Sequence, residues 1–340
     1  MSLRICLVGD ISGNIDEGMK KITYNIYKGL SENHEVMIIK PSEIPFKKKE
    51  IADFKPDIIH YIPGPSILSF ALLKLAKLGL SYTKTVITAT HPQHLVPKRV
   101  LSILKPDLVL AQAYDMEALF RKLNIRTELY PNGVDIKKFK PVDERTKMEL
   151  REKYGIDKDK FVVLHVGNLR AGRNLDFLKI LKQDDDMQVV VVASTTIRKD
   201  IKIYNNLIDS RIKIIDYYVE DIENIYNLSD VYVFPVTRRP YAVEVPLSVM
   251  EAMACNLPVI STRFAGLPTF FPEGDGLIYI NTENDIIRSL YFIKDRILEN
   301  NLKIRTRKKV LPYSWDKLLK KLELIYFKLI EAGGDGYRTT

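Results

Sequence analysis

The sequence predicts an α/β protein made of two doubly wound domains of similar size, each with a parallel sheet covered by helices. Short apolar runs alternate with helix-length amphipathic segments almost to the end of the chain. Runs such as VVLHVG and VVVVA lack the polar alternation of a half-exposed sheet, so they indicate strands buried on both faces. The rhythm restarts near residue 160, and 340 residues are more than one hydrophobic core normally holds.

The first half of the chain contains six predicted strands separated by helical segments. The strands are residues 4–8, 35–39, 57–61, 85–89, 108–111 and 128–130, and the helices are residues 19–30, 67–78 and 114–123. The helical segments carry apolar residues at helical spacing. Strands separated by helices form βαβ units with right-handed crossovers, and this makes the sheet parallel.

The second half repeats this pattern after a connecting stretch rich in charge, proline and turn residues. Its predicted strands are residues 161–166, 188–192, 212–215, 231–234, 259–261 and 277–279. The connection contains one predicted helix, 144–154, and a last amphipathic helix is predicted over 314–329 with Ser314 as its N-cap. We therefore predict one domain over residues 1–157 with the terminal helix 314–332, and a second over residues 158–313.

Charge and cysteine content narrow the class of partner and the compartment. Lysine and arginine total 52 against 43 aspartate and glutamate, a net charge of +9, which favours a nucleotide, a phosphate or an acidic lipid surface. No nucleic-acid-binding motif accompanies this charge, so no nucleic-acid partner is expected. Cys6 and Cys255 are too few for a disulfide framework, and the N-terminus lacks a signal-peptide pattern, so we expect a reducing, cytoplasmic setting.

Residues 67–80 are the one candidate membrane segment in the sequence. They are too short to span a bilayer, and they include Lys74 and Lys77. We interpret them as an amphipathic helix packed on a sheet. The alternative is a helix that lies on the inner face of a membrane, with its lysines flanking an apolar face.

Ligands of doubly wound sheets bind beyond the carboxyl ends of the strands, so a cleft between the two domains is the expected site. The loop at residues 9–18, GDISGNIDEG, joins the first strand to the first helix. Gly13 and Gly18 would let the backbone approach a phosphate at the helix N-terminus. The spacing does not match the dinucleotide fingerprint, and a plain strand-to-helix turn is the alternative.

Two histidines follow the strand at residues 85–89 in the sequence TATHPQH. His91 lies at the expected carboxyl end of that strand. It is either a catalytic residue or a residue that makes a structural hydrogen bond. His94 lies three residues on, but no third metal ligand is evident. Asp184 to Asp186 are interpreted as a solvated loop, so no metal site is predicted.

Two further glycine-containing loops are candidates for turns or ligand contacts. Residues 131–135, PNGVD, contain an Asn-Gly pair that favours positive φ and a tight turn. Residues 165–174, HVGNLRAGRN, again join a predicted strand to a helix. Gly167 would permit a sharp turn there, and Arg170 and Arg173 would reach a diphosphate with bidentate contacts. Solvated surface arginines are the alternative.

Two glutamates bracket the start of a predicted helix in VEVPLSVMEAMACNLP, residues 243–258. Pro246 fits the first helical turn, with Glu244 just outside it and Glu251 about two turns inside. Asn256 fits a left-handed end of the helix. A carboxylate can accept two hydrogen bonds from a vicinal diol such as a ribose, which makes Glu251 a nucleotide-binding candidate. Solvated carboxylates are the alternative.

These stretches together resemble the retaining glycosyltransferases of family 4 (glycosyl transferases group 1), which have the GT-B fold. The resemblance is seen in three stretches of sequence: PNGVD at 131–135, HVGNLRAGRN at 165–174 and EVPLSVMEAMACNLPVIST at 244–262. Further similarity lies in SDVYVFP at 229–235, AGLP at 265–268 and YSWDK at 313–317. The resemblance spans nearly the whole chain and is most specific around Glu251.

The resemblance implies two Rossmann-like domains whose parallel sheets face a central cleft, the second domain binding a nucleotide-activated sugar. It places Glu251 on the ribose, Arg173 on the diphosphate, and Glu244 and His91 beside the transferred sugar as catalytic candidates. The loop of Gly13 and Gly18 would close on the donor phosphates. The donor-binding or nucleotide-binding candidates are Gly13, Gly18, Asn168, Arg170, Arg173, Val219, Pro246, Leu247, Ser248 and Glu251.

The chain departs from the family pattern at three places. The family separates its two glutamates by seven residues, whereas six lie between Glu244 and Glu251, so an ungapped alignment puts Val243 at the first position. Asn168 replaces the usual phosphate-binding arginine, and ASTT at 193–196 replaces a glycine-rich turn. We hypothesise that the missing positive charge comes from one of three other arginines. They are Arg170, Arg238 and Arg239.

The resulting prediction is a retaining, hexosyltransferase-like glycosyltransferase that works without a metal or other cofactor. It would move a sugar from a nucleoside-diphosphate sugar to a hydroxyl group of a glycan, a lipid-linked molecule or a small molecule, in polysaccharide or glycolipid biosynthesis. We expect a monomer or homodimer, with peripheral membrane contact as an open alternative. Two other functions stay open: a nucleotide-sugar epimerase of the same fold, and a catalytically weak nucleotide-sugar-binding subunit. The sequence leaves the base, the sugar, the acceptor and the linkage undetermined.

Overall fold

The computed structural model describes residues 2–92, 103–298 and 304–332, and within them the chain forms two compact units. Unit 1 contains residues 1–132, 243–245 and 315–340, and unit 2 contains residues 133–242 and 246–314. Residues 133–157, which the sequence suggested as the end of the first domain, are grouped with unit 2. The domain boundaries at residues 157 and 313 stay a prediction.

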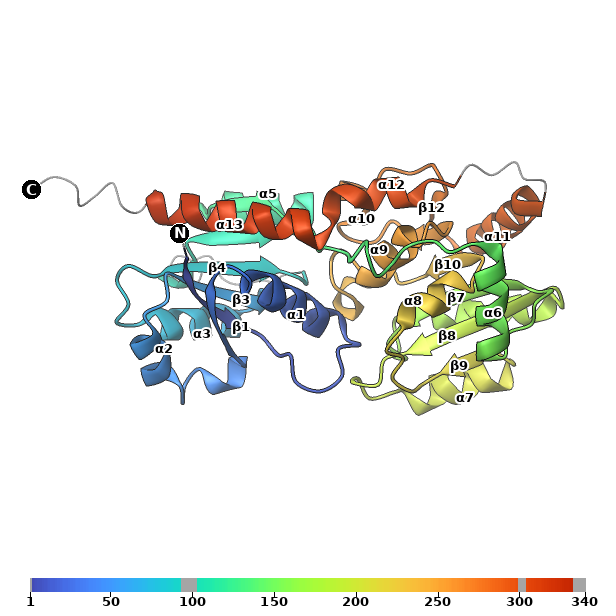
Figure 1. Ribbon diagram of the computed structural model, residues 1–340, viewed down its shortest axis with the longest axis horizontal. Coiled ribbons are helices and arrows are strands. Elements are labelled where there is room, and N and C mark those ends of the chain that lie inside the picture. The colour runs from blue at the N-terminus through green and yellow to red at the C-terminus, as the bar shows by residue number, and fades with distance from the viewer. Residues whose placement is uncertain (1, 93–102, 299–303, 333–340) are drawn as a thin grey trace, which may run out of the picture. The chain divides into compact units, whose positions relative to one another are not determined.

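Unit 1 is built on a six-stranded parallel sheet in the order β2-β1-β3-β4-β5-β6, among the described residues (Figure 1). The strands are β1 (Arg4–Val8), β2 (Glu35–Ile39), β3 (Ile58–Gly64), β4 (Lys84–Ala89), β5 (Leu108–Ala111) and β6 (Thr127–Leu129). The strand order reverses between β1 and β3, which makes the carboxyl ends of these two strands the switch point where ligands of such sheets bind.

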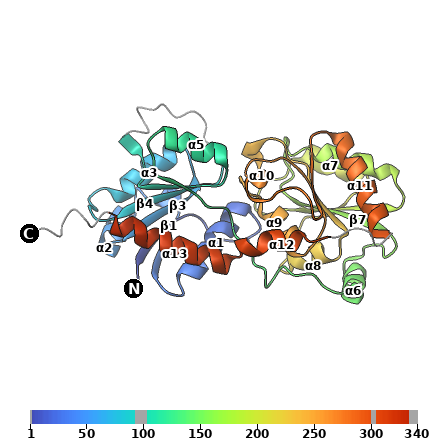
Figure 2. The ribbon, with the colours of Figure 1, turned by 90° about the horizontal axis from the view of Figure 1, so that it is seen from above.

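Helices cover this sheet with their apolar sides. They are α1 (Gly18–Leu30), α2 (Lys48–Phe54), α3 (Ile67–Lys77), α5 (Tyr114–Lys122) and α13 (Trp315–Glu331), with a short 3-10 turn, η1 (Pro41–Glu43). Phe70 of α3 and Phe120 of α5 are fully buried in one core cluster with strand residues such as Val8. The prediction that α3 packs on the sheet is therefore confirmed. The C-terminal helix α13 runs beside α1 in both views (Figures 1 and 2).

Unit 2 has its own parallel sheet, six-stranded within the described residues, in the order β12-β11-β10-β7-β8-β9. The strands are β7 (Phe161–Gly167), β8 (Met187–Ala193), β9 (Lys213–Ile215), β10 (Val231–Phe234), β11 (Val259–Thr262) and β12 (Leu277–Ile280). This is the Rossmann order, and its switch point lies between β7 and β10. The predicted fold class, an α/β protein with two doubly wound parallel sheets, is confirmed.

The helices of unit 2 are mostly short. They are α6 (Glu144–Tyr154), η2 (Leu175–Gln183), α7 (Ile201–Asp209), α8 (Ile222–Asn227), η3 (Arg239–Tyr241), α9 (Leu247–Ala254), α10 (Leu267–Phe270), α11 (Glu283–Leu298), α12 (Thr306–Val310) and η4 (Leu311–Tyr313). Leu178 and Leu290 are fully buried against strand residues such as Val191. Both faces of the sheet are thus shielded from water, which is why its strands read as continuous apolar runs.

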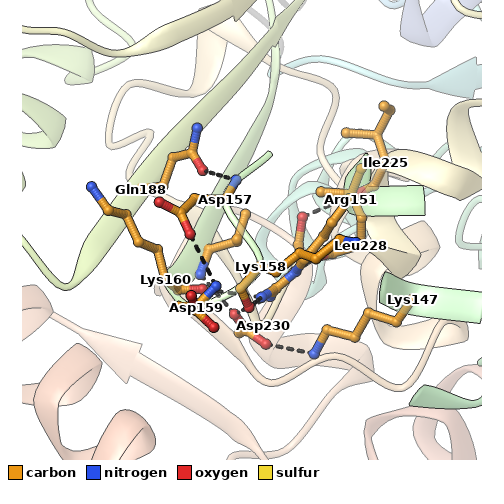
Figure 3. Close-up of polar contacts among 12 residues, drawn as sticks. Lys147, Arg151, Asp157, Lys158, Asp159, Lys160, Gln188, Ile225, Leu228 and Asp230 are labelled. Carbon is orange, nitrogen blue, oxygen red and sulfur yellow. Dashed lines mark hydrogen bonds and ion pairs between the residues drawn. The ribbon is translucent and has the colours of Figure 1, made fainter. Parts of the chain in front are cut away.

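A buried ion-pair cluster holds α6 against the sheet of unit 2 (Figure 3). Arg151 is 3% exposed and pairs with Asp230, which also pairs with Lys147 and accepts the backbone N–H of Val162. The same guanidinium donates to the backbone oxygens of Leu228, Lys158 and Lys160. This cluster gives residues 144–154 firm contacts with unit 2.

Helix α9 starts one residue later than the sequence suggested. Pro246 is the N-cap, with φ −63° and ψ 125°, and its carbonyl accepts the N–H of Met250. Proline lacks an N–H, so it stands at the entrance to the helix rather than inside it. Glu251 is then the fifth helical residue, little more than one turn in, instead of two. The expected left-handed ending at Asn256 is confirmed by its φ of 59°.

Candidate active site

The candidate site of unit 2 lies at the carboxyl ends of β7 and β10, where the strand order reverses. Strand β7 ends at Gly167, and the following loop carries Arg173. Strand β10 supplies Tyr232 and Phe234 beside it. The N-terminus of α9 follows the loop after β10 and carries Ser248 and, one turn on, Glu251.

Arg173 is a buried arginine held by contacts within unit 2. Its side chain is 5% exposed, its Nη1 donates to the backbone oxygen of Tyr241 at 2.9 Å, and its guanidinium lies 5.8 Å from the ring centre of Phe234. A Cβ at Gly167 would meet Nη2 of Arg173, so a larger residue there would displace the guanidinium. The guanidinium therefore packs directly on the end of β7.

Within the described part of the chain, burial dominates the electrostatics of Arg173, and no carboxylate is among the groups that shift its pKa. Burial lowers the pKa of Arg173 to about 10, so the group stays charged at neutral pH. Its Nε is buried without a hydrogen-bond partner, and so is Nε2 of the neighbouring His165. Burial first, and the charge of Arg173 second, lower the pKa of His165 to about 3, so this histidine is neutral. An unpaired buried donor on a cation suits an oxyanion.

The N-terminus of α9 points its first N–H groups away from the helix without a side-chain cap. Ser248 is half-buried there, and its Oγ accepts a hydrogen bond from the hydroxyl of Tyr232 at 2.7 Å. The ring of Tyr232 stacks on His165, with centroids 6.4 Å apart. Tyr232 thus links the start of α9 to the loop that holds Arg173. Free helical N–H groups and arginines are groups that bind anions, so we call this place the candidate anion site.

Glu251 is 5% exposed, so the interpretation as a solvated carboxylate is wrong. Its Oε2 accepts a hydrogen bond from the hydroxyl of Tyr226 at 2.8 Å. Burial, and next the charge of Glu251, raise the pKa of Tyr226 well above its ordinary value, so this hydroxyl remains a donor. The rings of Tyr226 and Tyr232 lie 5.9 Å apart, and together they connect the carboxylate to the candidate anion site.

The other predicted donor residues of unit 2 are less constrained. Asn168 is half-buried in the loop after β7, and the side chain of Arg170 is exposed. Val219 is half-buried in the loop between β9 and α8. Pro246 and Leu247 are buried at the start of α9. Of the two arginines in the HVGNLRAGRN loop, it is Arg173 that the structure brings together with Ser248 and Glu251 in unit 2.

The loop at residues 9–18 lies at the switch point of unit 1 and includes Gly13, whose φ is 68°. The N-terminus of α1 is capped by the carboxylate of Glu17, which accepts the N–H of Lys20 at 3.0 Å. Nζ of Lys20 donates to the backbone oxygen of Ser12, and Nζ of Lys40 lies 3.5 Å from Asp10. Lysine ammonium groups, rather than open helical N–H groups, are the positive charge of this loop.

His91 follows β4 as predicted, and its partners lie within unit 1. Its Nδ1 is 3.2 Å from Oγ1 of Thr90, and both residues direct backbone N–H groups to the oxygen of Gly64. Burial lowers the pKa of His91. The backbone N–H of Glu244 donates to the oxygen of Thr90 at 2.8 Å, so the two catalytic candidates lie on hydrogen-bonded segments. His94 lies outside the described residues.

The shift in glutamate spacing has a visible consequence in unit 1. Val243 lies against Gly18, where a Cβ would stand 3.6 Å from Cγ1 of the valine. The neighbouring side chain of Glu244 is fully buried. Val243, rather than Glu244, is therefore the residue that packs on Gly18.

The expected tight turn in PNGVD is wrong, because neither Asn132 nor Gly133 has a positive φ. The side chain of Asn132 instead donates to the backbone oxygen of Val245 at 2.7 Å and pairs with Gln112. These bonds stabilise an extended segment in place of a turn. They also explain why residues 243–245 are grouped with unit 1.

Sequence reasoning missed His165, Tyr226, Tyr232 and Phe234, which surround Arg173 and Glu251. Tyr232 and Phe234 lie in the apolar run of SDVYVFP, which indicates core, and Tyr226 lies in the short helix before it. The polar tips of the two tyrosines and of His165 are a weak signal in the sequence, because their partners are distant in the chain.

The described part of the chain contains neither a metal-binding cluster nor a membrane-spanning helix. There, no three side chains among histidine, cysteine, aspartate and glutamate stand close enough to hold a metal ion. In the same residues, no helix has the length and apolar character needed to cross a bilayer. Cys6 and Cys255 are free and buried.

The fold and the candidate site of unit 2 define a class. The chain has the GT-B fold, and residues 160–291 match the family model of the glycosyl transferases group 1. This domain covers β7 to β12, the part of the chain that carries Arg173, Ser248 and Glu251. The resemblance to the glycosyl transferases group 1 is confirmed over these residues.

Relatives of the chain are glycosyltransferases. It is 27% identical to the sulfoquinovosyl transferase of Arabidopsis thaliana over 66% of this chain and 46% of that protein. It is 23% identical to the N-acetyl-alpha-D-glucosaminyl L-malate synthase of Bacillus anthracis over 57% of this chain and 52% of that protein. The chain thus spans about half the length of these curated relatives.

Solved structures share the fold over nearly the full chain. HepE of Anabaena, in complex with UDP, superposes with a TM-score of 0.76 and 15% identity, covering 96% of this chain and all of that one. At this identity, the likeness establishes the fold.

Proposed function

We propose that this protein is a metal-independent, retaining glycosyltransferase that moves a sugar from a nucleoside-diphosphate sugar to a hydroxyl acceptor. The observation that carries this proposal is Arg173, a buried cation with an unpaired Nε beside the end of β7 and near the open N-terminus of α9. A nucleoside diphosphate supplies the oxyanion that this arrangement suits.

The geometry of unit 2 and the family resemblance support a specific set of donor contacts. The diphosphate binds Arg173 and the N–H groups of Leu247 and Ser248 at the start of α9. The ribose hydroxyls donate hydrogen bonds to the carboxylate of Glu251. The hydroxyl of Tyr226 also donates to this carboxylate and holds it in place. Pro246 sets the start of the helix, and Val219 and Asn168 line the nucleotide side. Arg170, Arg238 or Arg239 adds positive charge at the phosphates.

Leaving-group stabilisation is the main catalytic contribution of these residues. Departure of the nucleoside diphosphate leaves an oxocarbenium-like sugar, and positive side chains and helical N–H groups stabilise the departing charge without a metal. The family resemblance gives His91 and Glu244 as the catalytic residues, and Gly13 and Gly18 as contacts of the donor phosphates. The leaving phosphate takes the acceptor proton, so no protein base is assigned. Retention follows from the family resemblance.

The acceptor is a hydroxyl group of a glycan, a lipid-linked molecule or a small molecule. The net charge of +9 and the exposed start of α3, where Leu68 is 66% exposed, support a lipid-linked acceptor at the inner face of a membrane. We expect the enzyme in the cytoplasm, as a monomer or homodimer.

A donor screen followed by product analysis tests this function. Thermal shift against UDP-, GDP- and ADP-sugars identifies the base, since a ligand at a hundred times its dissociation constant adds roughly 2.7 kcal/mol of stability. Transfer to acceptor panels is then measured with and without EDTA, and proton NMR of the product reports the anomeric configuration. Loss of transfer with EDTA, or an inverted product, contradicts the mechanism. A donor screen with no shift contradicts the function.

A nucleotide-sugar-binding subunit with little activity is the second candidate. The fully buried side chain of Glu244 and the presence of Val243 on the side facing Gly18 favour it. Under this function, Arg173→Ala and Glu251→Ala abolish nucleotide binding, and no acceptor yields product. A Val243→Glu variant that gains transfer would support a weak subunit, and robust transfer by the wild type excludes it. Epimer formation from UDP-GlcNAc without acceptor would instead identify an epimerase.

A further inference from the structure

Unit 2 contains a second hollow, on the other side of β10 from the donor residues. Its volume is about 410 Å³, and it lies at the carboxyl ends of β10, β11 and β12. The lining includes Thr237, Arg239, Thr262, Arg263, Phe264 and Asn281. This volume falls in the range of small-molecule sites.

The polar groups of this hollow are dominated by hydrogen-bond donors. Arg239 and Arg263 come from different loops, one after β10 and one after β11, and Asn281 follows β12. Guanidinium groups bind carboxylate, sulfonate and phosphate oxygens with two parallel hydrogen bonds. Two guanidiniums with hydroxyl and amide groups around them suit an oxyanion rather than a neutral or cationic group.

Arg263 is held in position by its neighbours. Its Nη2 lies 2.8 Å from Oε2 of Glu273, and its guanidinium lies 5.1 Å from the ring centre of Tyr279. The other oxygen of Glu273 accepts the backbone N–H of Tyr279 at 3.1 Å. Glu273 therefore orients Arg263 and cancels part of its charge. Arg239 is the second arginine of the lining.

The hollow shares a chain segment with the diphosphate arginine. Arg239 begins the short helix η3, which ends at Tyr241, and the backbone oxygen of Tyr241 accepts Nη1 of Arg173 at 2.9 Å. Oγ1 of Thr262 donates to the backbone oxygen of Val236, which ties the loops after β10 and β11 together. The segment that accepts the hydrogen bond of Arg173 thus also contributes to the lining of the hollow.

We propose that this hollow is an oxyanion site that binds a negatively charged group of the donor sugar, as in a uronate, a sulfonated sugar or a sugar phosphate. The assignment to the donor rests on the proposed function. A free inorganic anion has the same chemistry and is the other source, which the experiment separates.

Calorimetric titrations of the full chain at constant ionic strength test the proposal. The ligands are inorganic phosphate and two donor pairs, UDP-glucose with UDP-glucuronate and GDP-mannose with GDP-mannuronate. We expect the wild type to bind the uronate of one pair at least ten-fold more tightly than its neutral partner. Arg263→Gln removes this preference and leaves the neutral donor within twofold, and Arg263→Lys keeps part of it.

Two further variants sharpen the result. Glu273→Gln releases Arg263 from its internal counter-charge, so it strengthens uronate binding, an effect that a purely structural ion pair does not predict. Arg145→Gln is the matched control, because Arg145 has the same charge, is in the same unit and has a side chain that is 90% exposed on α6. We expect Arg145→Gln to leave the affinities for phosphate and for all four nucleotide sugars unchanged.

Each outcome decides the proposal. A uronate preference that survives Arg263→Gln, or no preference in the wild type together with phosphate binding unaffected by Arg263→Gln, overturns it. Phosphate binding that Arg263→Gln weakens, without a uronate preference, identifies a free anion and overturns the donor source. If no nucleotide sugar binds but phosphate responds to both Arg263→Gln and Glu273→Gln, the oxyanion site stands and the proposed function fails.

Discussion

At the scale of single residues, the account depends on the cost of burying a charge without a counter-charge. A buried guanidinium with an unpaired donor is unfavourable unless a ligand or a partner satisfies it. Arg173 gains one backbone oxygen and an aromatic face, and its Nε gains neither. The energy of this arrangement is recovered when an oxyanion binds, as expected of a residue that serves ligand binding more than stability.

Arg173→Ala is expected to weaken the transition state for transfer by about 2–4 kcal/mol, because the departing diphosphate loses its buried cation. The measurement is kcat/KM for the donor found in the screen. Arg170→Ala, which removes an exposed arginine from the same loop, is the control and has a smaller effect. Equal losses in both variants would show that general positive charge, rather than the position of Arg173, matters.

Glu251→Ala is expected to weaken binding of the nucleoside diphosphate while leaving binding of inorganic pyrophosphate unchanged. The reason is that the carboxylate bonds the ribose hydroxyls and not the phosphates. Competition titrations with the nucleoside diphosphate, its 2′,3′-dideoxy form and pyrophosphate separate the contributions. The dideoxy nucleotide should bind wild type and variant alike, and a loss of pyrophosphate affinity would contradict the assignment.

At the scale of elements, the sequence predicts those strands and helices that depend on a local pattern of residues. It does not predict segments whose path depends on contacts with distant residues. Continuous apolar runs such as residues 188–192 identified buried strands, because burial on both faces leaves no polar position. Strand β3 runs on through Pro63 to Gly64, past the expected end, since Gly64 still pairs with Ala89 after a register shift. The extended path of Asn132 depends on bonds to distant residues, Gln112 and Val245, which local preference cannot reveal.

In the candidate site, too, some residues can be recognised in the sequence and others only from tertiary contacts. Gly167, Arg173 and Glu251 stand out in the sequence because glycine, arginine and glutamate are unusual at strand ends and inside apolar helices. Tyr226 and Tyr232 do not stand out, because an aromatic residue in an apolar run is normally core, and only tertiary contacts reveal the hydroxyl partners. The hollow beside Arg263 is assembled from three loops and has no sequence motif.

Asp230→Asn is expected to lower the free energy of unfolding by about 3 kcal/mol, because it leaves the buried Arg151 without its counter-charge. Urea unfolding measures the change. Glu149→Gln is the matched control, since its partner Arg145 is 90% exposed, and such surface pairs contribute about 0.5 kcal/mol. A loss of free energy of unfolding below about 1 kcal/mol in Asp230→Asn is no more than one hydrogen bond contributes. It would mean that the backbone acceptors alone satisfy Arg151.

At the scale of the whole molecule, each unit contains a buried neutral histidine that makes stability depend on pH. His60 of unit 1 lies between the hydroxyls of Tyr326 and Thr88, and burial lowers its pKa to about 3. His165 of unit 2 has a similar pKa, lowered by burial and by Arg173. Two histidines that stay neutral in the folded state and become charged on unfolding favour the folded state at neutral pH.

The free energy of unfolding is therefore expected to fall as pH falls from 6.5 towards 3. Below pH 6.5 the unfolded chain binds protons at His60 and His165 that the folded chain does not, at a slope on the order of 1.4 kcal/mol per pH unit for each histidine. Urea titrations between pH 4 and 7 measure it. His60→Gln should flatten the curve relative to wild type, and identical slopes would contradict a neutral, buried His60.

The most direct test of the central claim is the affinity of wild type and Arg173→Ala for the nucleoside diphosphate of the best donor. Calorimetry under matched conditions, with circular dichroism to establish that both proteins are folded, gives the comparison. The account predicts that the wild type binds and that the folded variant binds at least thirty-fold more weakly, which corresponds to about 2 kcal/mol. A wild type that binds no nucleoside diphosphate, or a variant that binds equally well, would contradict it.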